Sequence, residues 1–242
     1  MSVNEKKAVR RSGAGLATLA GMEVVSALRE RQTVAGHIFD SLRDAIRTGV
    51  LKDGDDLNQV GLAEHFGVSR VPIREALRAL EAEGWIKAPT NQRAFVQSLS
   101  IEEVSEVFEM RELIEVDLIG KSIGLLNDTS FATLEDFCDK MERAKDHETW
   151  VRNNWEFHTQ LLKYSGRVVA IGVVSHLASQ VERYLRPLKA GPDRRLQANA
   201  EHRMIIDALR RGDKPTARSL MRKHIRTTRK LVIDNLRRVQ SK

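Results

Sequence analysis

The chain has 242 residues, a formal net charge of +7, 41% hydrophobic and 30% charged residues, and one cysteine. This apolar fraction fits one large folded domain or two small ones and excludes wholesale disorder. The lone Cys138 excludes a disulfide framework and a zinc site built from several cysteines. The longest uncharged runs are too short to span a membrane, and no signal peptide is visible, so we expect a cytoplasmic protein.

The charge is distributed unevenly along the chain. Residues 183–242 carry 18 basic and 5 acidic side chains, whereas residues 99–182 carry 8 basic and 16 acidic ones. The basic excess therefore lies far from the segment in which a DNA-binding motif is found, and net charge alone is weak evidence for a nucleic-acid partner. We expect the basic final helix to present a solvated face, with phosphate contact or pairing with a partner subunit as alternatives.

The N-terminal segment changes character near Val34. Residues 1–32 show no sustained hydrophobic period, which predicts a flexible N-terminal arm, with a short helix near Met22–Glu30 as an alternative. From Val34 onward, apolar residues recur at helical spacing as far as Ile46. Thr33 is the expected N-cap of this helix and Gly49 its expected C-terminal stop.

Two further helices and two strands are predicted before residue 98. A glycine-containing turn separates the helices, and a polar tip separates the strands. Two helices joined by a tight turn and followed by a hairpin are the layout of a winged helix-turn-helix, which we place at residues 33–98. The expected elements are helices at 59–66 and about 70–83, and strands at 85–88 and 94–97.

The helix that begins after Ser69 has the features of a DNA-reading helix. Its N-terminus favours a phosphate, and Pro72 sits in the first turn, where a missing N–H costs nothing. Arg70 and Arg74 are four residues apart and share one face, and arginine can bind guanine with two hydrogen bonds in the major groove. An ordinary solvated arginine face is the alternative. The candidate DNA-contacting residues are Ser69, Arg70, Val71, Pro72, Arg74, Arg78 and Arg93.

After Leu99 the strand signals end, and an all-helical domain is predicted at residues 99–242. A capping box, Ser100 to Glu103, opens its first helix. The expected fold is thus mainly α: a winged helix-turn-helix followed by an all-α antiparallel helical bundle. Its six expected helices span about 100–126, 130–146, 149–164, 168–188, 194–211 and 214–239.

Histidines on three of these helices form a candidate metal site. Asn154 and His158 lie four residues apart on one helix, while His202 and His224 lie on two others. Side chains from facing helices can converge inside a bundle, and imidazole is a common ligand of zinc and nickel. Spacing alone leaves ordinary histidines without metal as an open alternative. Arg111 lies on an apolar helix face and needs a partner, either a carboxylate of the bundle or a small acidic effector.

Residues 33–97 resemble the winged-helix domain of the GntR family of bacterial transcription regulators. The resemblance implies that Ser69, Arg70 and Arg74 contact operator DNA and that the wing tip lies near the minor groove. Arg93 stands where the family usually has glycine, and its side chain could instead reach a phosphate or the minor groove. The matching residues are Leu42 to Ile46, Gly49, Leu51, Gly54, Leu57, Leu62-Ala63, Gly67 to Arg70, Pro72, Arg74 to Leu77, Leu80 and Gly84.

Residues 100–239 resemble the FCD ligand-binding domain of the FadR-type branch, in its six-helix, VanR-like arrangement. In that family an aspartate and three histidines hold a divalent metal, and an effector carboxylate and an arginine of the first helix complete the site. The resemblance assigns these roles to His158, His202, His224 and Arg111, with Asn154 as a neutral, weaker donor in place of the aspartate. The matching points are Phe108 to Arg111, Glu115, Asn154, Phe157-His158, Glu201-His202, Ile205, Ala208-Leu209, Gly212-Asp213, Ala217, Met221 and His224-Ile225.

Together these features predict a DNA-binding transcriptional repressor, not an enzyme. We expect a homodimer that reads a pseudo-palindromic operator and responds to a small carboxylic acid held at a zinc or nickel site. Two alternatives stay open: a metal-dependent hydrolase fused to a DNA-binding module, and a constitutive DNA binder without effector. The chain has no H-E-x-x-H, P-loop or G-x-S-x-G motif, which argues against the hydrolase.

Overall fold

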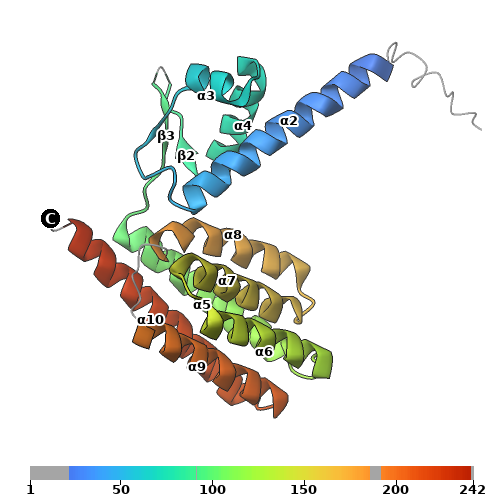
Figure 1. Ribbon diagram of the computed structural model, residues 1–242, viewed down its shortest axis with the longest axis vertical. Helices are drawn as coiled ribbons and strands as arrows, with labels where there is room; N and C mark the ends of the chain where they lie inside the picture. Colours follow the sequence, from blue (N-terminus) through green and yellow to red (C-terminus); the bar gives the residue numbers. More distant parts are fainter. Residues whose placement is uncertain (1–21, 91, 186–191, 241–242) are drawn as a thin grey trace, which may run out of the picture. The chain divides into compact units, whose positions relative to one another are not determined.

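The computed structural model describes residues 22–90, 92–185 and 192–240, which are mainly helical with one small sheet (Figure 1). The chain divides into two compact units. The first holds the residues up to Leu42 together with Leu57–Ala94, and the second holds Arg43–Asp56 together with Phe95–Lys242. The predicted fold class, a helix-turn-helix module followed by an all-helical domain, is confirmed.

The first helix, α2 (Met22–Arg47), begins earlier than the sequence pattern predicted. Thr33 lies inside this helix and is not its N-cap. Residues 22–32, predicted to belong to the N-terminal arm with a short helix near Met22–Glu30 as an alternative, are part of the same helix. These residues include several good helix formers, and their propensity outweighs the local capping signal of Thr33. The rest of the expected arm, residues 1–21, lies outside the described residues. Further along the helix, Ile38, Leu42 and Ile46 are buried, as the apolar spacing predicted.

The helix-turn-helix pair consists of α3 (Gln59–Phe66) and α4 (Arg70–Ala82), close to the predicted ranges. Gly67 ends α3 with φ of +64°, a left-handed conformation that glycine adopts without steric cost. Ile73 and Leu80 of α4 are fully buried, while the arginines of the same helix face outward. The local signals for a stop, a turn and a new helix therefore place α4 as expected.

The sheet of the wing has three strands rather than the expected two. β2 (Ile86–Lys87) and β3 (Ala94–Val96) correspond to the predicted hairpin, and β1 (Asp56–Leu57) pairs with β3 in the order β1-β3-β2. A strand of two residues beside turn-forming residues carries no alternating pattern, so β1 could not be recognised from sequence. Val96 joins the strands by donating its N–H to the carbonyl of Asp55 at 3.0 Å.

The second unit contains the helical domain, whose six helices occur in the predicted order. The capping box at its start is present: Glu103 N–H donates to Ser100 Oγ at 3.0 Å, and Ser100 N–H donates to Glu103 Oε2 at 2.7 Å. Interhelical contacts pair α5 with α10, α6 with α7 and α9 with α10. The helices are α5 (Ile101–Ser122), α6 (Asp128–Arg143), α7 (His147–Lys163), α8 (Val168–Leu185), α9 (Pro192–Arg210) and α10 (Lys214–Gln240).

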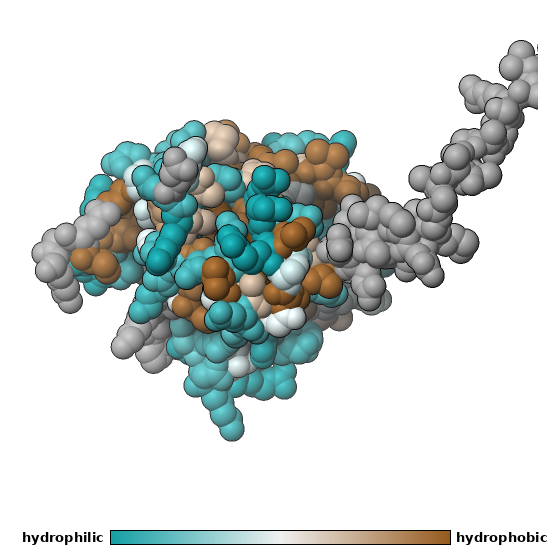
Figure 2. Space-filling view, turned by 90° about the horizontal axis from the view of Figure 1, so that it is seen from above, coloured by the Kyte–Doolittle hydropathy of each residue, from teal (hydrophilic) through white to brown (hydrophobic). Residues whose placement is uncertain are grey.

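The core of the helical unit is built from large side chains of all these helices, including Phe108, Leu134, Phe157, Val181 and Ile205. Hydrophilic groups with scattered apolar ones between them cover the face drawn in Figure 2, as is normal for a protein surface. Within the described ranges, no helix has both the length and the apolar character needed to cross a membrane.

Candidate functional site

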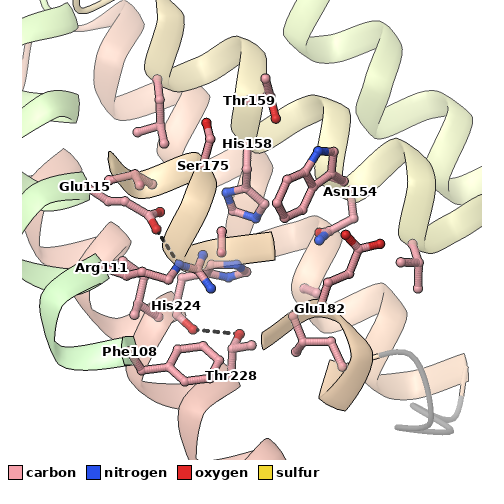
Figure 3. Close-up of a pocket in the computed structure, with 18 of the residues that line it drawn as sticks. Phe108, Arg111, Glu115, Asn154, His158, Thr159, Ser175, Glu182, His224 and Thr228 are labelled. Atoms are coloured by element: carbon pink, nitrogen blue, oxygen red, sulfur yellow. Dashed lines mark hydrogen bonds and ion pairs between the residues drawn. The ribbon is translucent and has the colours of Figure 1, made fainter. Parts of the chain in front are cut away.

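A cavity of about 120 Å³ lies inside the helical unit and is lined by side chains from α5, α7, α8, α9 and α10 (Figure 3). Its walls combine apolar groups such as Phe108 and Trp150 with a small set of polar and charged ones. An apolar cavity with a few convergent polar groups is the usual form of a small-molecule site. The polar and charged lining residues include Arg111, Glu115, Asn154, His158, Glu182, Arg194 and His224.

The three histidines matched to the family do converge beside this cavity. His158 of α7, His202 of α9 and His224 of α10 each offer one ring nitrogen, and these atoms lie within 4.8 Å of one another. Their ring centroids are 4.8 to 5.0 Å apart. The predicted meeting of imidazoles from three helices is thus present in the fold.

Unpaired buried nitrogen atoms show that these residues fit a metal ion. Both ring nitrogens of His202 and Nδ1 of His158 are buried without a hydrogen-bond partner. A buried polar atom without a partner costs free energy, and native structures avoid such atoms unless something else satisfies them. A divalent cation among the three rings would supply that partner, and neutral imidazoles are the donors that zinc and nickel favour.

The environment also keeps the rings of His158 and His202 in the metal-binding protonation state. Burial, followed by the neighbouring His224, lowers the pKa of His158 and of His202 well below the ordinary value. Neutral imidazole holds the lone pair that binds a metal, whereas the protonated ring has none. The cluster therefore holds at least two rings in the neutral form at pH 7.

The low pKa of His202 predicts that the metal-free protein loses stability on acidification. Above about pH 6.5, the ordinary histidine pKa, the ring is neutral in both folded and unfolded chains and adds no pH dependence. Below it the unfolded chain binds a proton that the folded chain does not, so the free energy of unfolding falls by up to about 1.4 kcal/mol per pH unit. Urea denaturation of chelator-treated wild type and His202→Gln between pH 7 and 5 measures this loss. If the free energy of unfolding changed equally with pH in both proteins, the prediction would be contradicted.

Asn154 lies one turn before His158 on α7, and both side chains line the cavity (Figure 3). Its carbonyl oxygen is a neutral donor, whereas an aspartate at this position would bring a negative charge to the site. Coordination of a metal by Asn154 stays a prediction.

Arg111 has the carboxylate partner that the sequence offered as an alternative. Its Nε donates to Glu115 Oε1 at 2.7 Å, and its guanidinium lies over the ring of Phe108 at 5.2 Å. Arg111 also lines the cavity, with a side chain that is 11% exposed. The ion pair with the buried Glu115 orients the arginine toward the cavity, so the two interpretations are compatible (Figure 3).

Sequence reasoning assigned no role to three further charged residues at the site: Glu182, Arg194 and Glu201. Glu182 lines the cavity and accepts a hydrogen bond from Arg47 Nη1 at 2.6 Å. Glu182 and the adjacent Arg183 are the two charged residues of α8, and this pair in an otherwise uncharged helix was a signal that could have singled Glu182 out. Glu201 lies 2.7 Å from His224 Nδ1, and no spacing pattern could reveal a contact between residues on different helices.

The candidate DNA-contacting side chains are exposed on the first unit, with one exception. Arg70, Arg74 and Arg78 are exposed on α4, and Val71 is 40% exposed. Ser69 occupies the N-cap position of α4, but its side chain makes no capping hydrogen bond. Arg93 is exposed next to β3.

The ring of Pro72 is buried in the first unit, and contact of this residue with DNA stays a prediction. Proline at this position serves the first turn of the helix, where its fixed φ is preorganised and its missing N–H is not needed. Helix geometry is therefore one physical reason for its match to the family pattern.

Comparison with known proteins identifies both parts of the chain. Residues 34–96 match the bacterial regulatory proteins of the gntR family, and residues 106–227 match the FCD domain. The uncharacterized HTH-type transcriptional regulator YdhC of Bacillus subtilis is 28% identical over 191 residues, which are 77% of this chain and 85% of that protein. A probable D-xylose utilization operon transcriptional repressor of Paenarthrobacter nicotinovorans is 25% identical over 211 residues, 84% of this chain and 91% of its own length.

A solved structure shows the same fold. Escherichia coli McbR/YncC superposes with a TM-score of 0.74 at 20% identity, over 84% of this chain and 98% of its own. Because the matched families and relatives are transcriptional regulators, the alternative of a metal-dependent hydrolase is rejected. The chain belongs to the GntR family of bacterial transcription regulators and carries an FCD domain.

Proposed function

We propose that this regulator is a repressor whose binding to operator DNA is controlled by a small carboxylic acid held at a metal site in the helical domain. The observation that carries the proposal is the convergence of three imidazoles beside a cavity that Arg111 also lines. In this proposal residues 33–98 read DNA, and residues 99–242 bind the effector and form the dimer.

The DNA-binding part of the proposal rests on the exposed arginine face of α4. Arg70 and Arg74 would reach base edges in the major groove, and Ser69, with a hydroxyl not used in capping, would contact a phosphate. Arg78, one turn further along α4, and Arg93 at the wing would contact the phosphate backbone of the DNA. Val71, which follows Arg70 in the sequence, is also exposed and would make apolar contact with a base.

We propose a homodimer because one recognition helix reads only one half-site. A two-fold protein requires a two-fold operator, with half-sites one helical turn or a multiple of it apart. Sedimentation of the protein with and without operator tests this: a monomer that binds a single half-site would contradict it.

In the effector-binding part, His158, His202 and His224 would hold a zinc or nickel ion, with Asn154 as a further oxygen donor. The ion would supply a fixed positive charge to which an effector carboxylate binds. Because three imidazoles and an amide carry no negative charge, this set depends on an anionic effector more than a set with aspartate would. Arg111 would hold the same carboxylate from the α5 side of the cavity.

The size of the cavity limits the effector. An engineered cavity of about 150 Å³ binds benzene, so a cavity of about 120 Å³ fits a compact acid with roughly ten or fewer non-hydrogen atoms. Apolar walls that include Phe108, Trp150 and Leu185 favour a short apolar body over a polyhydroxylated one.

The experiment that tests the proposal combines metal, acid and DNA. Protein stripped with chelator is dialysed, reloaded with Zn²⁺ or Ni²⁺, and screened by thermal shift against small carboxylic acids. An operator for the same protein is selected from random duplexes. We expect a compact acid to raise the Tm only with metal present, and to weaken operator binding. Tight operator binding with no response to any metal or acid would instead support a constitutive DNA binder.

Replacing Arg111 with lysine is expected to weaken effector binding about tenfold while leaving metal affinity unchanged. Lysine keeps the charge opposite buried Glu115 but loses the planar fork that binds a carboxylate with two hydrogen bonds, and a hydrogen bond to a charged group is worth about 1.5–3 kcal/mol. Calorimetric titration of the active acid into metal-loaded protein measures the change. Wild-type affinity in Arg111→Lys would show that the arginine serves only Glu115.

A further inference from the structure

A buried carboxylate next to the histidine cluster has a contact that the proposed function does not use. Glu201 directly precedes His202 on α9, and its side chain is buried. Its Oε2 lies 2.7 Å from Nδ1 of His224 on α10. Its other oxygen, Oε1, accepts a hydrogen bond from Arg194 Nη1 at 3.2 Å. Arg194, Glu201 and His224 therefore form a chain of polar contacts that ends at the cluster.

This contact decides which ring nitrogen of His224 is available to bind a metal. A carboxylate accepts a hydrogen bond from Nδ1, so Nδ1 of His224 carries the proton and the lone pair is left on Nε2. Of the three rings in the cluster, His202 has no hydrogen-bond partner on either nitrogen, and Nδ1 of His158 has none. His224 is thus the ring whose orientation is fixed by a charged neighbour.

Glu201 also differs from the other buried carboxylates near the cavity. Glu115 is paired with Arg111, and Glu182 with Arg47, by bonds of 2.7 and 2.6 Å. Neither of these ion pairs involves a ring of the cluster. Glu201 instead shares its two oxygens between an arginine and an imidazole. Because Asn154 brings no charge, Glu201 is, within the ranges that the structure describes, the anionic group bonded to a ring of the cluster.

We propose that Glu201, held in place by Arg194, is the positioning residue of the metal centre: it fixes His224 with Nε2 toward the ion and makes this ring a stronger donor. The inference rests on the proposed metal site. Partners of this kind orient metal-binding histidines and raise their basicity, and their removal costs about 10- to 100-fold in metal affinity. Glu201 would thereby offset part of what the family pattern loses at Asn154.

The first test compares metal affinities. Zn²⁺ and Ni²⁺ dissociation constants of the full chain are measured by chelator competition for wild type, Glu201→Gln and Asp139→Asn. Asp139→Asn is the matched control because it removes another carboxylate that binds an α9 arginine, Arg203 at 2.8 Å, away from the cluster. We expect Glu201→Gln to bind about 10- to 100-fold more weakly and the control to bind like wild type.

A rescue variant separates positioning at the metal centre from a purely structural role. Adding Asn154→Asp to Glu201→Gln should restore much of the lost affinity, because it returns a negative charge to the site. A Glu201→Gln variant that lowers the Tm of metal-free protein but binds metal like wild type would overturn the inference. If wild type itself binds neither metal, both this inference and the proposed metal site fail, a result distinct from failure of Glu201 alone.

A second test uses wild-type protein alone and so does not depend on the folding of a variant. Long-range ¹H–¹⁵N NMR spectra of metal-free wild type report which nitrogen of each histidine carries the proton. We expect His224 to carry it on Nδ1, and metal to shift Nε2. A His224 ring protonated only on Nε2 would overturn the inference, whatever the variants do.

Discussion

Replacing both Arg70 and Arg74 with alanine is expected to weaken operator binding by about 2–6 kcal/mol, or roughly 30-fold and more at fixed salt. Both side chains are exposed on the same face of α4, while Ile73 and Leu80 of the same helix are fully buried. The truncations therefore remove groups that can bind base edges and leave the packing of the helix intact. Fluorescence anisotropy with the selected operator measures the change.

Arg78→Ala is the matched control for this pair. Arg78 lies on α4 and is exposed like Arg70 and Arg74, but we expect its side chain to contact a phosphate. Its loss should weaken binding to all duplexes alike and reduce the salt dependence by about one released ion, whereas loss of Arg70 or Arg74 should reduce the preference for the operator over random DNA. A double variant that binds the operator like wild type would show that α4 is not the reading helix.

Replacing His202 with alanine is expected to weaken Zn²⁺ or Ni²⁺ binding by about 3 kcal/mol or more, which is over roughly 100-fold in affinity. A site of about four ligands binds its metal with roughly 10–16 kcal/mol, so one ligand contributes about a quarter of that free energy. His202 is fully buried and neither of its nitrogens has a hydrogen-bond partner, so within the described residues its polar atoms have no role other than the cluster. Chelator competition measures the affinity. The variant should still bind the operator, but the acid should no longer release it.

His65→Ala controls for adventitious metal binding, because His65 is exposed on α3 in the other unit. It should bind metal and respond to acid like wild type. Equal metal affinity in His202→Ala and wild type would place any bound ion elsewhere and remove the three-histidine site. Loss of operator binding in metal-free His202→Ala would instead contradict the division of roles between the two domains.

Local signals explain why so much of the fold could be predicted. Gly67 stops α3 because its left-handed φ suits glycine, and Ser100 starts α5 because its side chain and that of Glu103 satisfy each other's backbone N–H groups. Such signals act over three or four residues and are legible in sequence. Thr33 shows their limit: the same kind of capping residue lies inside a helix when its neighbours on both sides are helical.

The amino-acid sequence by itself determined the order of the helices, the arginine face of α4 and the histidines available to a metal. Helix periodicity and end signals depend on near neighbours, so they can be interpreted along the chain. Only the tertiary structure decided that rings from α7, α9 and α10 meet beside one cavity, that Pro72 is buried, and that Glu201 reaches His224. These contacts follow from how the helices pack and rotate against one another, which no short-range pattern encodes.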